Sequence, residues 1–201
     1  TALTEAHGDT HAADAAEDFC RRVRVMAGEH GEVVKPIGDA VMVRCDDAAA
    51  AVRLGLRIVG EFCGEHGSLP VRVGMHTGPA IERGGDYYGA TVNVAARIAA
   101  LAAGGEVLLS EQTAAAAGRA DGFDLRHHGM HALRNVAEPV AVLRAVAPGE
   151  PSAGLDVDPV CRMVVDPGQA AGVLEHEGRR YRFCSIECAG VFARDPARHA
   201  L

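Results

Sequence analysis

Three groups of side chains in this sequence have residue types and spacings that chemistry can use. Lys35 and Asp39 flank the turn of a predicted hairpin over 33–43, in which two apolar or β-branched runs surround Gly38-Asp39. Because strand residues alternate between faces and a turn re-aims the residues after it, the ammonium and the carboxylate need not meet. A tip that presents an acid and a base separately suits a charged, metal-bound ligand. The alternative is a solvated turn with surface charges.

The second group, Asn93 and Arg97, lies on a predicted helix over 91–103 that is otherwise rich in Ala and Val. Residues four apart share one helix face. A polar pair on such a helix faces water, a partner or a ligand, because burying it without partners is costly. The alternative is a surface asparagine beside an arginine whose stem lies along the surface. Asp86, in the predicted irregular loop 84–89, would by itself be a loop-tip acid.

The third group consists of Cys161, Cys184 and Cys188. A helix would aim the thiols of Cys184 and Cys188 the same way, and Cys161 could approach from a preceding turn. Three convergent thiols in a small module favour a soft or borderline metal, Zn(II) or Cu(I), which would offset a thin core. The alternative is that the cysteines pack as small hydrophobic side chains. A zinc site normally takes four ligands, and the candidates for the fourth, which the sequence leaves open, are Asp158, His176 and His199.

The composition is that of an ordinary globular protein. The chain has 201 residues, 48% of them hydrophobic and 23% charged, which allows one large or two small domains. A net charge of −7 predicts no nucleic-acid partner. There is no apolar run of about 18 residues, and no signal peptide is visible in this sequence. Six cysteines are too few for a disulfide scaffold, so we expect a cytoplasmic protein without a membrane span.

The elements that position these residues follow from the apolar periodicity. Runs of hairpin strands mixed with helices favour an α+β fold, with the sheet covered on one face. Gly31 is expected to end the first helix. The segment 148–155 is a linker by composition. The predicted helices cover 14–30, 48–65, 91–103 and 111–117, and the predicted strands and hairpins cover 32–45, 70–76, 80–83, 106–110, 123–128, 132–146 and 172–181.

Three ordered stretches carry a family resemblance. Lys-Pro-Ile-Gly-Asp at 35–39, Val-Gly-Met-His-Thr-Gly-Pro at 73–79 and Asp-Tyr-Tyr-Gly-Ala-Thr-Val-Asn-Val-Ala-Ala-Arg at 86–97 together resemble the catalytic domain of class III nucleotide cyclases. The stretch 133–140 is similar to that family's final hairpin. The resemblance covers 1–147 and implies a ferredoxin-like α+β fold.

The resemblance also implies roles for the matching residues. Asp39 resembles one of two aspartates that hold two magnesium or manganese ions, and Lys35 and Asp86 resemble the pair that reads the purine edge, in the combination associated with adenine. Asn93 resembles the residue that orients the ribose, and Arg97 the arginine that stabilises charge on the α-phosphate. In the family these groups meet across a head-to-tail homodimer. The implied activity is conversion of ATP to cyclic AMP and pyrophosphate; the alternative is an inactive homologue that binds nucleotide or a partner.

One departure from the family pattern bears on activity. The family's domain opens with an internal strand that carries the other metal aspartate, and residues 1–8 resemble the segment just after that strand. Asp9 and Asp14 are poor substitutes by position. We therefore expect the first strand of the fold to be missing, and this 201-residue chain to bind metal poorly and turn over little or not at all. We expect the full gene product to carry the strand.

Residues 156–201 resemble the YHS domain, a small treble-clef-like metal-binding module. Tyr181 and Ser185 fit its pattern, while Arg182 stands where the name-giving histidine would be. Fusion to a cyclase leads to the hypothesis that this module regulates it. His76 is expected to be a packed strand residue rather than a ligand. A second metal cluster is one interpretation of His127, His128 and His131, but we expect them to be exposed strand residues, because positions 127 and 128 face opposite ways.

Overall fold

The computed structural model describes residues 9–28, 30–63, 70–149 and 156–199. In this part of the chain no helix is both long and apolar enough to cross a membrane. The elements in chain order are α2 (Asp9–Ala27), β1 (Glu32–Ile37), β2 (Ala40–Arg44), α3 (Ala48–Cys63), β3 (Val73–Met75), β4 (Ile81–Arg83), β5 (Asp86–Tyr88), α4 (Ala90–Leu101), β6 (Val107–Ser110), α5 (Glu111–Ala117), β7 (Asp124–His131), β8 (Val140–Val146), β9 (Gly172–His176), β10 (Arg179–Phe183), α6 (Ile186–Arg194) and α7 (Pro196–His199).

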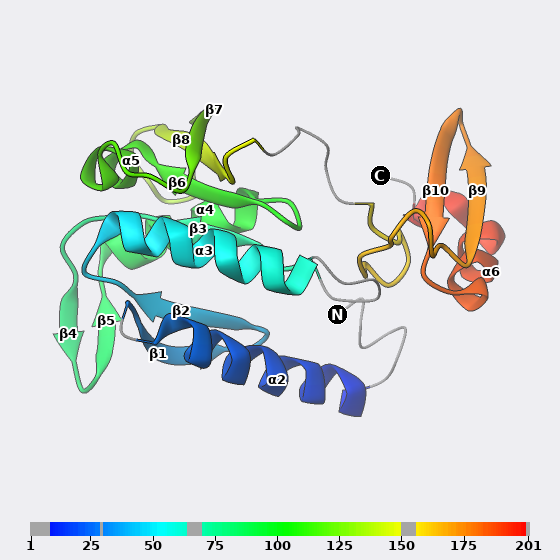
Figure 1. Ribbon diagram of the computed structural model, residues 1–201, viewed down its shortest axis with the longest axis horizontal. Coiled ribbons are helices and arrows are strands. Elements are labelled where there is room, and N and C mark those ends of the chain that lie inside the picture. The colour runs from blue at the N-terminus through cyan, green and yellow to red at the C-terminus, as the bar shows by residue number, and fades with distance from the viewer. Residues whose placement is uncertain (1–8, 29, 64–69, 150–155, 200–201) are drawn as a thin grey trace.

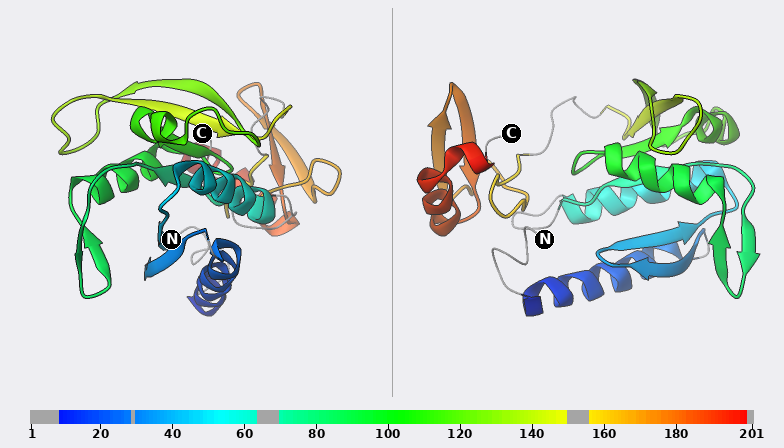
Figure 2. Two further views of the ribbon diagram at one scale, coloured as in Figure 1. Left: turned by 60° about the vertical axis from the view of Figure 1, so that its left-hand side comes forward. Right: turned by 180° about the vertical axis from the view of Figure 1, so that it is seen from behind.

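The centre of the first domain is a four-stranded sheet in the order β3-β6-β8-β7. Strand β3 is parallel to β6, whereas the β6–β8 and β8–β7 pairs are antiparallel. Leu108 of β6 packs against Ile98 of α4, while Val107 and Leu109 pack with Val52 of α3. All of β6 is buried, because α3 and α4 lie on opposite faces of the sheet (Figures 1 and 2). The expectation of a sheet covered on one face was therefore wrong.

The hairpin β1–β2 forms a sheet of its own. Its turn lies at Gly38 and Asp39 as predicted, with Gly38 at φ 62°. Within the described residues β2 does not pair with β3. Strands β2 and β3 nevertheless belong to one apolar cluster, to which helices α2 and α3 also contribute side chains. They include Val23, Leu54, Ile58, Val41, Val43 and Val73.

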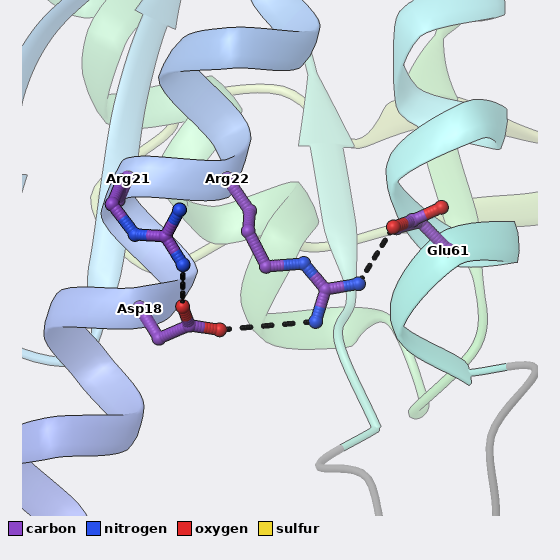
Figure 3. A network of polar contacts seen from close by, with 4 residues as sticks. All are labelled: Asp18, Arg21, Arg22 and Glu61. Atoms are coloured by element: carbon purple, nitrogen blue, oxygen red, sulfur yellow. Dashed lines mark hydrogen bonds and ion pairs between the residues drawn. The ribbon is translucent and has the colours of Figure 1, made fainter.

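A polar contact at the edge of this cluster links α2 to α3 (Figure 3). The Arg22 guanidinium donates to Glu61 Oε1 at 2.7 Å and lies 3.8 Å from Asp18 Oδ2, while Arg21 also contacts Asp18. The same guanidinium stands 4.3 Å from the centroid of the Phe62 ring. Exposed ion pairs contribute little to stability, so the stacking on Phe62 and the apolar cluster beneath it hold the two helices together.

The hairpin β4–β5 extends away from the central sheet beside β1 (Figure 1). Its turn consists of Gly84 and Gly85, with φ values of 61° and 77°. Two successive residues with positive φ form the tight turn that suits the twist of paired strands. The prediction of an irregular loop over 84–89 was therefore wrong, because Asp86–Tyr88 is a strand paired with Ile81–Arg83.

Several predicted boundaries also move. Helix α2 begins before residue 14, and Gly28, at φ 50°, rather than Gly31, follows its last residue. Gly31 is needed for another reason, since a Cβ there would stand 2.9 Å from Cys45 Sγ. The last predicted strand begins only at Val140, after a loop in which Asn135 adopts φ 62°. The strand predicted over 70–76 is reduced to Val73–Met75, and the predicted end of α3 lies outside the described residues.

The C-terminal module is built on the hairpin β9–β10 and helix α6. Glu177 and Gly178, at φ 50° and 74°, form the predicted hairpin tip. Helix α6 begins at Ile186, with Ser185 as its N-cap. The prediction that one helix carries both Cys184 and Cys188 was therefore wrong. Most of the linker, 150–155, lies outside the described residues, and the small core of the module consists of Cys161, Phe183, Cys188 and Phe192.

We predict that Gly74→Ala strongly destabilises the first domain. A Cβ at Gly74 would stand 2.0 Å from the backbone nitrogen of Ala99 in α4, so helix and strand would have to separate. Overpacking of this kind typically costs about 1–3 kcal/mol, which urea unfolding would measure. Gly60→Ala, at an exposed position of α3, is the matched control. It meets no atom within 4 Å and should stabilise by up to about 1 kcal/mol. Equal midpoints for the two variants would contradict the close approach.

Candidate functional site

Lys35 and Asp86 form a direct ion pair between β1 and β5, with Lys35 Nζ 2.5 Å from Asp86 Oδ2. The Lys35 side chain is 41% exposed and that of Asp86 19%. Asp86 Oδ1 also accepts the N–H of Tyr87 at 2.8 Å, which fixes the carboxylate. The hydrogen bond raises the pKa of Lys35 and lowers the pKa of Asp86. The tertiary structure therefore brings together two groups, 51 positions apart, that the sequence assigned to one ligand.

Asp39 stands apart from this pair at the exposed hairpin turn. Lys35 makes its ion pair with Asp86 and not with Asp39, as the alternation of the strand permits. Over the described ranges, the group of three or more metal-binding side chains that gathers in one place belongs to the C-terminal module. Asp39 therefore belongs to no such group among the described residues of one chain, whereas hard divalent ions take several oxygen ligands.

Asn93 and Arg97 lie on the exposed face of α4, opposite the buried Val94 and Ile98. The helix begins after Gly89, whose φ of 133° brings the chain into α4 without a side-chain cap. Neither polar side chain has a hydrogen-bond or ion-pair partner among the residues that the structure describes. One guanidinium and one amide on adjacent turns are therefore available for an anionic or hydroxyl-bearing ligand.

His76 follows β3 and belongs to a hydrogen-bonded group rather than to a metal site. Its Nδ1 lies 2.8 Å from Ser110 Oγ, which is 3.2 Å from Thr113 Oγ1, and Thr77 donates to Thr113 at 3.1 Å. Burial lowers the pKa of His76. The ring is therefore kept neutral, and it ties the end of β3 to β6 and α5.

The three cysteines of the C-terminal module converge as predicted. Cys161 Sγ lies 3.4 Å from Cys184 Sγ, and Cys184 Sγ lies 4.0 Å from Cys188 Sγ. Asp158 completes a group whose ligand atoms all lie within 4.8 Å of one another. A tetrahedral zinc ion with Zn–S bonds of about 2.3 Å needs sulfur atoms about 3.8 Å apart. The donor set and its spacing therefore fit a thiophilic metal.

Asp158 is fully buried and makes several backbone contacts. Its Oδ1 accepts the N–H groups of Val160 and Cys161, at 2.8 and 3.3 Å, and its Oδ2 accepts that of Cys184 at 2.8 Å. Burial raises the pKa of Cys161 to about 12 and also raises the pKa of Cys184. Without a metal these thiols stay protonated, so metal binding must release protons.

The other candidates for a fourth ligand lie elsewhere. The ring of His176 packs edge-on against Phe192, at 6.1 Å between centroids, and His199 is in α7. Neither belongs to the group of four. Arg182, at the position of the name-giving histidine, donates to Asp156 Oδ2 at 2.9 Å. The sequence also indicated a local role for Asp158. An Asp side chain at a turn typically accepts hydrogen bonds from the backbone N–H groups of the residues two and three positions later.

The histidines of β7 depart from the expected alternation. A bulge between His127 and Gly129 inserts an extra residue, so His128 and His131 come to lie on the same side. Their rings stack with centroids 4.8 Å apart, and His128 Nδ1 lies 2.9 Å from His131 Nε2. The expectation that all three are exposed was wrong for this half-buried pair, because a bulge changes the period of the strand.

Comparison with known proteins identifies the class. Residues 1–142 match the family described as adenylate and guanylate cyclase catalytic domain, and residues 157–200 match the YHS domain. Because the first match covers well over half of the chain, this protein belongs to the adenylate and guanylate cyclase catalytic domain family, and a YHS domain follows the cyclase domain. The resemblance and the class III cyclase fold expected from the sequence are confirmed.

Relatives agree with this assignment. The pH-sensitive adenylate cyclase MT1302 of Mycobacterium tuberculosis is 35% identical over 114 residues, which cover 55% of this chain and 29% of that protein. An adenylate cyclase of Streptomyces coelicolor is 34% identical over 85 residues, which cover 42% of this chain and 22% of that protein. The chain thus spans less than a third of the length of these relatives.

Solved structures support the fold. Adenylate cyclases of Trypanosoma brucei in their monomeric state align with a TM-score of 0.64 at 27% identity, covering 82% of this chain and 90% of theirs. The adenylyl cyclase CyaB of P. aeruginosa aligns with a TM-score of 0.61 at 23% identity, over 76% of this chain and 90% of that one. The second likeness bears on the fold alone.

We predict that His76 makes stability depend on pH. Its pKa in the folded protein lies below the unfolded value of about 6.5, so unfolding takes up a proton at low pH. Stability is therefore complete above about pH 6.5 and is lost as the pH falls below it. His76→Asn keeps a partner for Ser110 but cannot titrate, so its denaturation midpoint should fall less between about pH 7 and pH 5. Parallel pH profiles would show that His76 does not contribute.

Proposed function

We propose that the full gene product is an adenylate cyclase that converts ATP to cyclic AMP and pyrophosphate in the cytoplasm. The observation that carries the proposal is the contact between Lys35 and Asp86, which come from two separate hairpins and meet at 2.5 Å. An ammonium donor beside a carboxylate acceptor matches the adjacent acceptor and donor on the edge of adenine. The pair is partly exposed, so a purine can part the two charges and bond to both.

Arg97 and Asn93 supply the remaining contacts to the nucleotide. Arg97 stabilises the charge that develops on the α-phosphate as the ribose 3′-oxygen attacks it and pyrophosphate leaves. Asn93, one turn earlier on the same face of α4, orients the ribose. Both side chains are exposed and unpartnered within the described ranges, as a site that awaits its ligand requires. The chemistry needs no covalent enzyme intermediate.

The site is completed by a second copy of the chain in a head-to-tail homodimer. The support is that one chain presents Asp39 apart from Lys35 and Asp86, and that the hairpins expose apolar side chains. Ile37, Ile81 and Tyr88 are 52%, 62% and 51% exposed. Two magnesium or manganese ions per active site would neutralise the phosphates and activate the attacking oxygen. Asp39 is one carboxylate that would hold them, and the other belongs to the strand that we expect before residue 1.

The YHS module binds zinc or copper through Cys161, Cys184 and Cys188 and tunes the output of the cyclase. The support is the convergence of the thiols and the fusion of the two modules.

The second candidate function is a domain that binds nucleotide or a partner without turnover. Asp39 favours it, because Asp39 belongs to no group of three or more metal-binding side chains in the described part of the chain, whereas two-metal chemistry needs several ligands.

The first test compares cyclic AMP formation by this chain with that by a chain extended through the upstream strand. ATP is the substrate, GTP the control, and Mn(II) is present. We expect cyclic AMP from the extended chain only, because the family resemblance puts the second metal carboxylate on the strand that the extension would add. Robust turnover by the 201-residue chain would contradict that role for the strand. No product from either chain would favour the binding-only function.

A second test asks whether α4 takes part in the chemistry. In the extended chain Arg97→Ala should lower kcat by about 100-fold or more, because removing one preorganised charge from a transition state typically costs that much. Arg119→Ala, also an exposed arginine of the same domain, should leave kcat unchanged. Equal activities for the two variants would remove Arg97 from the mechanism, and circular dichroism would verify that both variants fold.

A further inference from the structure

We propose that the YHS metal site consists of the three thiolates of Cys161, Cys184 and Cys188 with an open fourth position, and that Asp158 is a positioning residue rather than a ligand. The inference rests on the proposed metal binding by this module. It concerns a choice that the grouping of four side chains leaves open. A site closed by Asp158 would be structural, whereas a site with an open position can exchange ligands.

The hydrogen bonds of Asp158 are the first argument. Its carboxylate accepts three backbone N–H groups, two on Oδ1 and one on Oδ2. An ionised carboxylate offers about four lone-pair positions, so most are already occupied. The side chain is 0% exposed, so no water can replace a lost partner. Turning an oxygen toward a metal would leave a buried N–H unpaired, at a cost of about 1–3 kcal/mol.

The segments that Asp158 joins are the second argument. Cys161 lies on the turn that follows Asp158, and Cys184 lies 26 residues away at the end of β10. One carboxylate bonds the N–H of both, and so brings their thiols to 3.4 Å. Cys188 is held in a similar way, since its N–H donates to Ser185 Oγ at 3.2 Å. Each of the three cysteines is thus positioned by another residue's side chain, which accepts a hydrogen bond from the backbone N–H of that cysteine.

The exposure of the thiols is the third argument. Cys161 and Cys188 are buried, whereas Cys184 is only partly buried. The Sγ separations of 3.4 and 4.0 Å lie on either side of the roughly 3.8 Å that thiolates around zinc require. Because Cys184 is the least buried of the three residues, we expect a fourth ligand to reach a metal on this triangle from its side. The fourth ligand is therefore a small exogenous donor such as water, a thiol or an imidazole.

The test uses the full reduced chain with Co(II) as a spectroscopic probe of the site. We expect sulfur-to-cobalt charge transfer of three thiolates, and we expect excess imidazole to shift the d–d bands while that charge transfer stays. Asp158→Asn keeps one acceptor oxygen but cannot bond both segments. It should bind Co(II) about 10- to 100-fold more weakly, with the same charge-transfer intensity and the same imidazole response. Cys45→Ser, a thiol outside the group, should match the wild type.

The possible results distinguish an incorrect role for Asp158 from a failure of the proposed metal binding. If the wild-type spectrum ignores imidazole and Asp158→Asn gains the response, Asp158 is a ligand and the inference is overturned while metal binding stands. If the wild type shows no thiolate charge transfer with Co(II), and binds neither Zn(II) nor Cu(I), both are overturned. The wild-type imidazole titration decides the coordination even if the variant does not fold.

Discussion

The close approach of α4 to β3 is the constraint on which the first domain depends. Gly74 has no side chain, and the backbone of Ala99 fills the space where a Cβ would be. That contact sets the height of α4 over the sheet and turns Val94 and Ile98 inward. With the inner face fixed, Asn93 and Arg97 can only point outward. A packing requirement in the core therefore determines where the polar residues of α4 are presented.

The protein uses two carboxylates in opposite ways. Asp86 is paired with Lys35 near the surface, where water competes and an ion pair contributes little net stability. Such a pair links the two hairpins at one point and can open for a ligand. Asp158 is buried, and its three N–H donors belong to the backbone. A bond of that kind is costly to break, so Asp158 suits a fixed scaffold and Asp86 an exchangeable contact.

The two modules differ in how much of their site one chain holds. The YHS module gathers its thiols within its own described residues, on a core of four buried side chains. The cyclase domain presents its polar residues on separate elements, with Asp39, Asn93 and Arg97 all exposed. We infer that the thiol site forms within one chain, whereas the nucleotide site depends on a second copy and on the nucleotide.

The sequence by itself determined the family, most of the elements and the residue types of both sites. Ordered motifs such as Lys-Pro-Ile-Gly-Asp, and the Gly-Asp and Glu-Gly turns, are local signals, and local signals survive without a structure. The strand Asp86–Tyr88 was missed because a strand of three residues has too little pattern to distinguish it from a loop. Only the tertiary structure decided that Lys35 meets Asp86, that a bulge pairs His128 with His131, and that Asp158 rather than His176 or His199 lies among the thiols. Each of these contacts depends on register and packing between separate segments, which spacing along the chain does not encode.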